Sequence, residues 1–139
     1  MLSSYKYIIA LVVAWLVAHL MKVCLLAIKT RHLTLLPGPG NMPSGHSAVV
    51  VSILTMIGLT EGMTSALFGL ALAVAVIVMY DATHVRLATG RQAEVIGDII
   101  KKTKLDIRAP KIVRGHTYIE VLVGAAIGFL VSYIVFITT

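Results

Sequence analysis

Charged residues, aromatic residues and cysteine are all scarce in this chain of 139 residues. Charged side chains make up 13% of it and aromatic side chains 6%, whereas about a quarter of a soluble domain is charged. The single cysteine, Cys24, lies within an apolar run, so no internal disulfide framework can form. The sequence contains no HExxH, CxxC or P-loop pattern, and we therefore expect neither a metal nor a cofactor.

Hydrophobic residues are abundant instead, at 58% of the chain, and the mean hydropathy is +0.94. Long apolar runs predict four membrane spans, at about 7–28, 46–59, 65–83 and 118–137. The second is short for a bilayer and implies local thinning or partial burial. The first is too long for a signal peptide and lacks a cleavage site, so we expect a retained span. We expect one membrane-embedded domain over 1–139.

Between the third and fourth predicted spans lies a polar segment, 84–116. Its apolar residues Val95, Ile96, Ile99 and Ile100 recur at helical spacing, which predicts a short amphipathic helix lying on the membrane. Residues 37–40, Pro-Gly-Pro-Gly, are helix breakers and predict a loop between the first two spans. The expected fold is therefore an all-α polytopic membrane bundle of about four transmembrane helices and one interfacial helix. Such a thin bundle is compatible with a homodimer.

Positive charge is concentrated in two loops. Lys29 and Arg31 follow the first span, and eight cations follow the third: Arg86, Arg91, Lys101, Lys102, Lys104, Arg108, Lys111 and Arg114. Two crossings separate these loops, so both lie on one side, and the positive-inside rule predicts that this side is the cytoplasmic face of the cell (inner) membrane. Most of these lysines are expected to contact lipid headgroups of the bilayer. We expect no nucleic-acid partner.

Two histidines stand at the heads of hydrophobic stretches on this same face. Pro43–His46 precedes the second span, and Gly115-His116 precedes the fourth, with Glu120 one helical turn further on. Backbone N–H groups and the helix dipole make helix N-termini attractive to phosphate. The arrangement indicates a single site for phosphoryl chemistry at a membrane surface.

At these residues the chain resembles the type-2 phosphatidate phosphatases, which share their active site with the vanadium haloperoxidases, and in particular their small divergent membrane branch. The matching pieces are Lys22 through Arg31, Gly40 through Ala48, Tyr80-Asp81-Ala82, Val85-Arg86, Gly90 through Val95, Gly115-His116-Thr117, Glu120-Val121 and Gly124. The resemblance implies a membrane phosphatase that acts on a phospholipid or isoprenoid phosphate: a phosphate monoester, or a polyprenyl phosphate or diphosphate. It also implies sensitivity to vanadate.

The residues suggest roles for such a reaction. His116 can be the nucleophile that becomes a phosphohistidine, Glu120 at i+4 can hold one of its ring nitrogens, and His46 can protonate the leaving group. Cations and donors around the phosphate oxygens would be Lys22, Arg31, Ser44, Gly45 and Arg86. Side-chain cations would thus take the place that a metal has in other phosphatases.

The chain departs from the superfamily's motifs in two places that matter for charge. No Arg-Pro ends the first motif, and Pro110 stands where the third motif has an arginine. The missing cation must come from Arg86, Arg91 or Arg114. We favour Arg86, because it directly follows a span and Asp81, one helical turn away, can orient it. Asp81 and Arg91 are candidates for residues that hold the phosphate-binding side chains in place without contacting the substrate.

Structural roles compete with several of these assignments. Ser44 can be a helix N-cap, Gly115-His116 a simple loop-to-helix junction, and Lys22 a snorkelling lysine. His19 is expected to pack against another helix, and Asp81 can pair with His84 or Lys22. Two other functions also remain open: a non-catalytic lipid-phosphate-binding protein, or a small transporter component with Asp81 and His84 as a proton relay.

Overall fold

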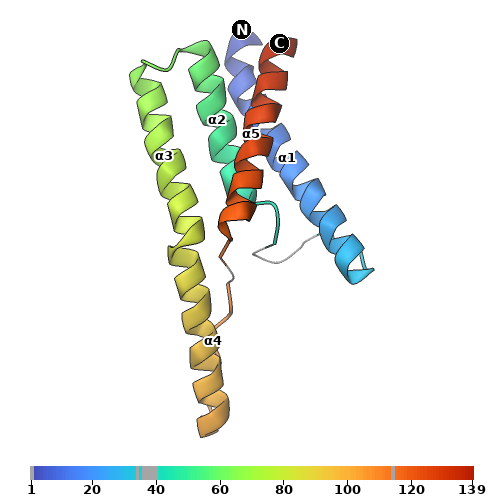
Figure 1. The fold of residues 1–139 in the computed structure, drawn as a ribbon, viewed down its shortest axis with the longest axis vertical. Coiled ribbons are helices and arrows are strands. Elements are labelled where there is room, and N and C mark those ends of the chain that lie inside the picture. The colour runs from blue at the N-terminus through green and yellow to red at the C-terminus, as the bar shows by residue number, and fades with distance from the viewer. Residues whose placement is uncertain (1, 34, 36–40, 114) are drawn as a thin grey trace.

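The computed structural model describes residues 2–33, 35, 41–113 and 115–139. The described residues form five helices: α1 (Leu2–Thr30), α2 (Gly45–Thr60), α3 (Ala66–Thr83), α4 (Val85–Thr103) and α5 (Tyr118–Thr138). The prediction of an all-helical fold is confirmed (Figure 1), and every apolar run expected to span the membrane is a helix. The expected Pro-Gly-Pro-Gly break at 37–40 lies outside the described residues.

Within the part of the chain that the structure describes, three helical segments are long and apolar enough to cross a membrane: Tyr5–Thr30, Ala66–Thr103 and Tyr118–Thr138. The chain is an integral membrane protein. Helix α2 is also apolar but has only 16 residues. At 1.5 Å per residue it is about 24 Å long, less than the hydrocarbon core of about 30 Å. Its N-terminus can therefore lie below the bilayer surface, with polar residues brought to that depth.

The helices are arranged so that the ends expected to carry function lie together. Both termini and the α2–α3 turn lie at one end of the bundle, and the starts of α2 and α5 lie toward the other (Figure 1). Helix α2 is central and packs against α1, α3 and α5. The expectation that both cation-bearing loops lie on one side agrees with this topology.

Small residues allow α2 and α5 to pack closely. A Cβ atom added at Gly124 would collide with the backbone carbonyl oxygen of Ser44, and one at Gly128 with that of Ala48. One turn further on, the buried Ser132 hydroxyl donates to the carbonyl of Ser52. Gly124, Gly128 and Ser132 thus form a small-residue seam of the kind that brings helix backbones together in membranes.

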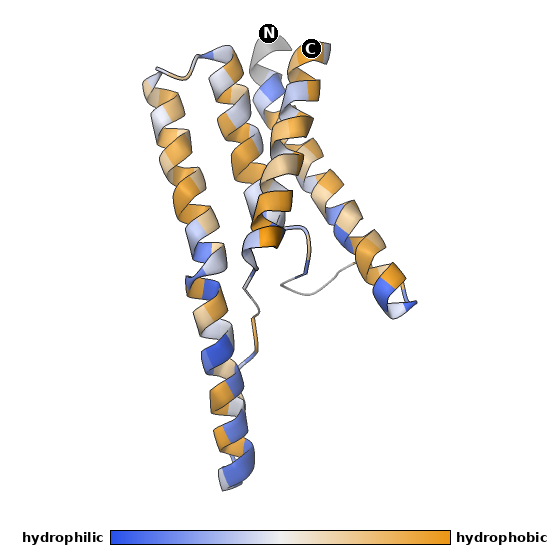
Figure 2. Ribbon diagram, viewed as in Figure 1, coloured by the Kyte–Doolittle hydropathy of each residue, from blue (hydrophilic) through white to orange (hydrophobic). Residues whose placement is uncertain are grey.

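The polar segment does form the expected helix, α4, but not with the expected orientation. It continues along the direction of α3 and projects beyond the bundle (Figure 1), and polar and apolar residues mix along it (Figure 2). The reason lies in the backbone at His84: its N–H donates to Tyr80 and its carbonyl accepts from Ala88. Helical hydrogen bonds therefore run through the junction, and the chain does not turn to lie flat.

Candidate active site

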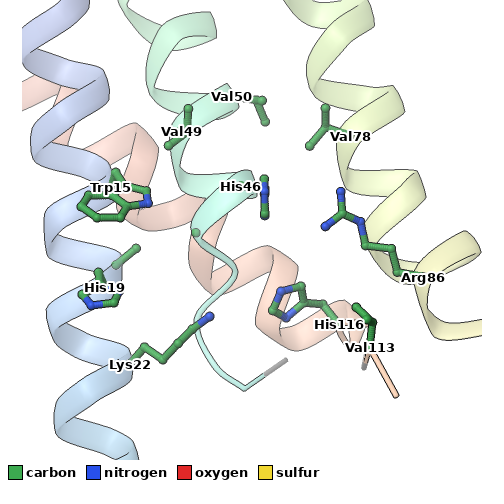
Figure 3. A pocket seen from close by; sticks show the side chains of 12 residues that line it. Trp15, His19, Lys22, His46, Val49, Val50, Val78, Arg86, Val113 and His116 are labelled. Atoms are coloured by element: carbon green, nitrogen blue, oxygen red, sulfur yellow. The ribbon is translucent and has the colours of Figure 1, made fainter. Parts of the chain in front are cut away.

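Five polar side chains from four separate segments border one cavity of about 280 Å³ (Figure 3). They are His19, Lys22, His46, Arg86 and His116. Helix α1 contributes the first two, α2 and α4 contribute one each, and the segment that leads into α5 contributes the last. The sequence-predicted histidines and two of the predicted cations are therefore brought together.

His116 is oriented by the residue one turn along α5. Its Nδ1 lies 3.0 Å from Oε2 of Glu120, and that oxygen also accepts the backbone N–H of Thr117 at 3.0 Å. An ionised carboxylate can only accept, so Nδ1 carries the proton and Nε2 is left with its lone pair. Thr117 and Glu120 complete a capping box, which fixes the carboxylate. His116 is buried, at 7% exposed, beside the cavity.

A close backbone contact at Gly115 brings His116 to the same cavity as Arg86 of α4. A side chain at Gly115 would collide with the backbone of Leu87, so only glycine lets the chain lie against the start of α4. The next residue, His116, donates its backbone N–H to Ala82 at 2.9 Å. The chain entering α5 is thus fastened to the α3–α4 junction, and His116 and Arg86 border the same cavity.

His46 occupies the first turn of α2, whose N-terminus is tied to that of α5. Ser44 caps α2 by accepting the backbone N–H of Ser47, and its own N–H donates to the carbonyl of Glu120 at 3.0 Å. This bond and the contact between Gly124 and Ser44 set the two helix starts side by side. His46 is exposed toward the cavity, opposite the guanidinium of Arg86 (Figure 3).

Arg86 is held by Asp81, as the sequence predicted. Its Nε donates to Oδ2 of Asp81 at 2.6 Å. Among the described residues this is its one side-chain hydrogen bond, and the terminal amino groups point into the cavity (Figure 3). Lys22 extends its amine toward the same space from α1. Two cations and three imidazoles therefore border a region suited to an anion.

The remaining predicted site residues lie in different places. Gly45 borders the cavity. Ser44 is fully buried and engaged as an N-cap, so its structural role is realised and its hydroxyl is not open to the cavity. Arg31 follows the end of α1, nine residues beyond Lys22 or about 13 Å along a helix, and does not border the cavity. Arg91 lines two other grooves, one of which it shares with Glu120, and Arg114 lies outside the described residues.

Sequence reasoning assigned His19 to packing, but it borders the cavity. Its ring stacks on Trp15 with centroids 5.3 Å apart, and its Nε2 lies 3.0 Å from the carbonyl oxygen of Leu35. The missed signal was the spacing to Lys22, three residues on and hence on the same helical face. Asp81 pairs with Arg86, not with His84 or Lys22.

The cavity is polar at one end and apolar at the other. Its apolar lining includes Trp15, Val49, Val50 and Val78. Val49, Val50 and Val78 lie further toward the end of the bundle that holds the termini than Lys22 and His46 do, whereas Trp15 lies level with His46 and the apolar Val113 lies beside His116 (Figure 3). The apolar end is therefore directed into the part of the bundle expected to lie within the bilayer.

Comparison with known proteins assigns the chain to a family. Residues 3–131 match the model of the divergent PAP2 family. The chain is also similar to the uncharacterized membrane protein YuiD of Bacillus subtilis (strain 168), with 34% identity over an alignment that covers 84% of this chain and 85% of that protein. The chain belongs to the divergent PAP2 family. No solved structure matches it.

The match to the divergent PAP2 family includes every residue that borders the cavity. The resemblance inferred from the sequence is thereby confirmed at the level of the family. Among the described residues, no three His, Cys, Asp or Glu side chains cluster so as to hold a metal ion. Independence from metals stays a prediction for this divergent PAP2 protein.

Proposed function

We propose that this divergent PAP2 protein is a membrane phosphatase. Its substrate would be a lipid phosphate monoester, or a polyprenyl phosphate or diphosphate. The observation that carries the proposal is the convergence of His46, His116, Lys22 and Arg86 on one cavity, with Nδ1 of His116 held by Glu120. This set provides a nucleophile, an acid and cations, which are the groups that phosphomonoester cleavage requires.

In the proposed reaction, Nε2 of His116 attacks phosphorus and forms an N–P bond while the P–O bond to the lipid breaks. Protonated His46 gives its proton to the leaving oxygen. Water then attacks the phosphohistidine, neutral His46 takes a proton from it, and the N–P bond breaks to release phosphate. His116 and protonated His46 are thereby restored.

Arg86 and Lys22 would stabilise the charge on the equatorial oxygens of the phosphoryl group. Because Asp81 occupies Nε of Arg86, the terminal amino groups of the guanidinium are left for phosphate oxygens. The N-terminus of α2, with Gly45 bordering the cavity, adds backbone N–H groups directed at an anion. Side-chain and backbone groups would thus supply the positive charge without a metal.

The form of the cavity supports a lipid substrate. A phosphate bound between Lys22 and Arg86 would leave its ester chain pointing along Trp15 and Val50, toward the apolar end. A soluble phosphate ester would gain nothing from these side chains. The cation-rich loops further support an active site at the cytoplasmic face of the cell membrane.

One observation favours the alternative of a non-catalytic lipid-phosphate binder. Ser44 is buried as a helix cap and Arg31 lies away from the cavity, so fewer groups surround the phosphate than the sequence predicted. A site with two cations can bind an anion without stabilising the transition state enough for turnover. Phosphate release distinguishes the two functions.

The test is phosphate release by the purified protein in detergent micelles, in the presence of EDTA. Phosphatidate, phosphatidylglycerophosphate, and polyprenyl phosphate and diphosphate form the panel. The phosphatase proposal predicts release from at least one of them, inhibition by vanadate, and no release by His116→Ala. Binding without release would favour the alternative, and activity that requires added magnesium would contradict the metal-free mechanism.

A further inference from the structure

His84 makes contacts on the side of the α3–α4 junction away from the cavity. Its ring stacks on Tyr80 of α3, with centroids 4.1 Å apart and planes 8° from parallel. The edge of the same ring meets Tyr118, the first residue of α5, at 5.8 Å and 80°. His84 therefore touches both of the elements that it joins, although it does not border the cavity.

Both ring nitrogens of His84 lie within hydrogen-bond distance of a hydroxyl group. Nδ1 lies 2.9 Å from the Thr83 hydroxyl, at the end of α3, and Nε2 lies 3.2 Å from the Tyr118 hydroxyl. The ring thus links the end of α3 to the start of α5.

The position of this link matters because each end lies two residues from a group of the active site. Arg86 follows His84, and Tyr118 follows His116. Direct packing between α3 and α5 is sparse compared with the packing of α2 on α5. Among the described residues, two hydrogen bonds join these segments. One runs from the backbone N–H of His116 to the carbonyl of Ala82, and the other lies between the side chains of His84 and Tyr118.

We propose that His84 and Tyr118 form a clamp that keeps Arg86 in register with His116. Both are positioning residues, since they act through their neighbours in sequence and touch no substrate. The proposal rests on the proposed function, in which Arg86 and His116 act on the same phosphate. Loss of the clamp would leave both side chains present but let the distance between them vary.

The test uses substitutions that remove one bond at a time. Tyr118→Phe removes the hydroxyl and keeps the ring. His84→Asn keeps an amide near the position of Nδ1, within reach of Thr83, but cannot reach Tyr118. His84→Gln reaches the position of Nε2 and offers Tyr118 an acceptor. We expect Tyr118→Phe and His84→Asn each to lower kcat about three- to tenfold, the factor that one ordinary hydrogen bond supplies, and His84→Gln to recover most of it.

The double variant distinguishes a clamp from two independent effects. If the bond is what matters, His84→Asn with Tyr118→Phe should lower kcat no further than either change alone. The proposal would be overturned if the double variant lost kcat by the product of the two single losses. It would also be overturned if His84→Gln and His84→Asn lowered kcat equally. Lowered thermal stability with kcat unchanged would likewise overturn it, because that is the result of a purely structural contact.

Affinity for inorganic phosphate keeps this proposal separate from the proposed function. Calorimetry measures the binding of inorganic phosphate to the same variants, and this measurement requires no turnover. If the wild-type protein releases no phosphate from any lipid, the phosphatase proposal fails. The clamp then stands if phosphate affinity falls non-additively in the variants, and fails if affinity is unchanged or if the wild type binds no phosphate.

Discussion

At the scale of single residues, the site depends on one carboxylate oxygen with two partners. Oε2 of Glu120 accepts from the backbone N–H of Thr117 and also lies within hydrogen-bond distance of Nδ1 of His116. The same oxygen therefore caps α5 and selects the tautomer of the proposed nucleophile. Helix capping and chemistry are coupled here, but a substitution can separate them.

Glu120→Gln should separate them. Glutamine also completes a capping box, so the helix cap and the thermal stability should persist. Its amide can present N–H to Nδ1 of His116 and favour the tautomer with the proton on Nε2. We expect kcat to fall on the order of 10²- to 10⁴-fold. Thr117→Ala is the control: it should cost about 1 kcal/mol of stability through the lost cap and leave most activity. Equal activity of the two variants would contradict the tautomer argument.

Arg86→Lys should lose most activity. A lysine amine lacks the planar fork that lets Arg86 bond Asp81 through Nε and phosphate oxygens through its terminal amino groups at the same time. The charge-assisted bonds, worth about 1.5–3 kcal/mol, are therefore weakened, which corresponds to about 10- to 100-fold in kcat. Arg91→Lys, on the same helix but away from the cavity, should keep nearly full activity. The reverse ranking would mean that the phosphate binds elsewhere on α4.

Local spacing made some of these residues predictable. His116 and Glu120 are four residues apart, the spacing of neighbours on one helical face, and Asp81 and Arg86 are five residues apart across the α3–α4 junction; both pairs are present. Arg31 was chosen by resemblance to a motif with a different spacing, and the continuation of α1 to Thr30 carries it past the cavity. The role of His19 at the cavity depends on which face of α1 meets α2, which the sequence of α1 alone does not specify.

At the scale of helices, the seam between α2 and α5 sets the distance between the two histidines. Gly124 contacts the carbonyl of Ser44, the residue that caps α2 two positions before His46. Any side chain at this position must push the start of α2 away from α5. Stability and activity should therefore fall together when the seam is widened.

Gly124→Ala tests this seam. The added methyl group meets backbone, which cannot rotate away, so we expect a loss of about 1–3 kcal/mol of stability together with reduced turnover. Gly69→Ala is the matched control, since that helical glycine in α3 has open space where a Cβ would lie. Thermal unfolding in detergent and phosphate release measure both effects. Unchanged activity and stability for Gly124→Ala would contradict the close contact.

Hydropathy predicted the helices well, because apolar length and N-capping residues such as Ser44 and Ser65 are local properties. It did not predict the direction of α4. Helical spacing tells which residues share a face, but the direction of α4 depends on the backbone hydrogen bonds through His84. The spacing of Gly124, Gly128 and Ser132 is visible in the sequence, whereas its partner α2 is known only from the packing.

At the scale of the whole molecule, the proposed function places the cavity and the cation-rich loops at the cytoplasmic face. The Lys104→Cys and Glu61→Cys variants, made in a Cys24→Ser background, place a single thiol at opposite ends of the protein. A membrane-impermeant maleimide should label intact cells at position 61, and at position 104 only after the cells are opened. Labelling of position 104 in intact cells would reverse the predicted orientation.

The central claim is that His116 carries the phosphoryl group during turnover. The most direct measurement is to mix the purified protein with a phosphate-labelled lipid from the panel, quench it within a single turnover, and locate the label by mass spectrometry. We predict phosphate on the peptide that contains His116 and none in His116→Ala. Lipid cleavage with no phosphate on His116, or phosphate on His46 instead, would contradict the account.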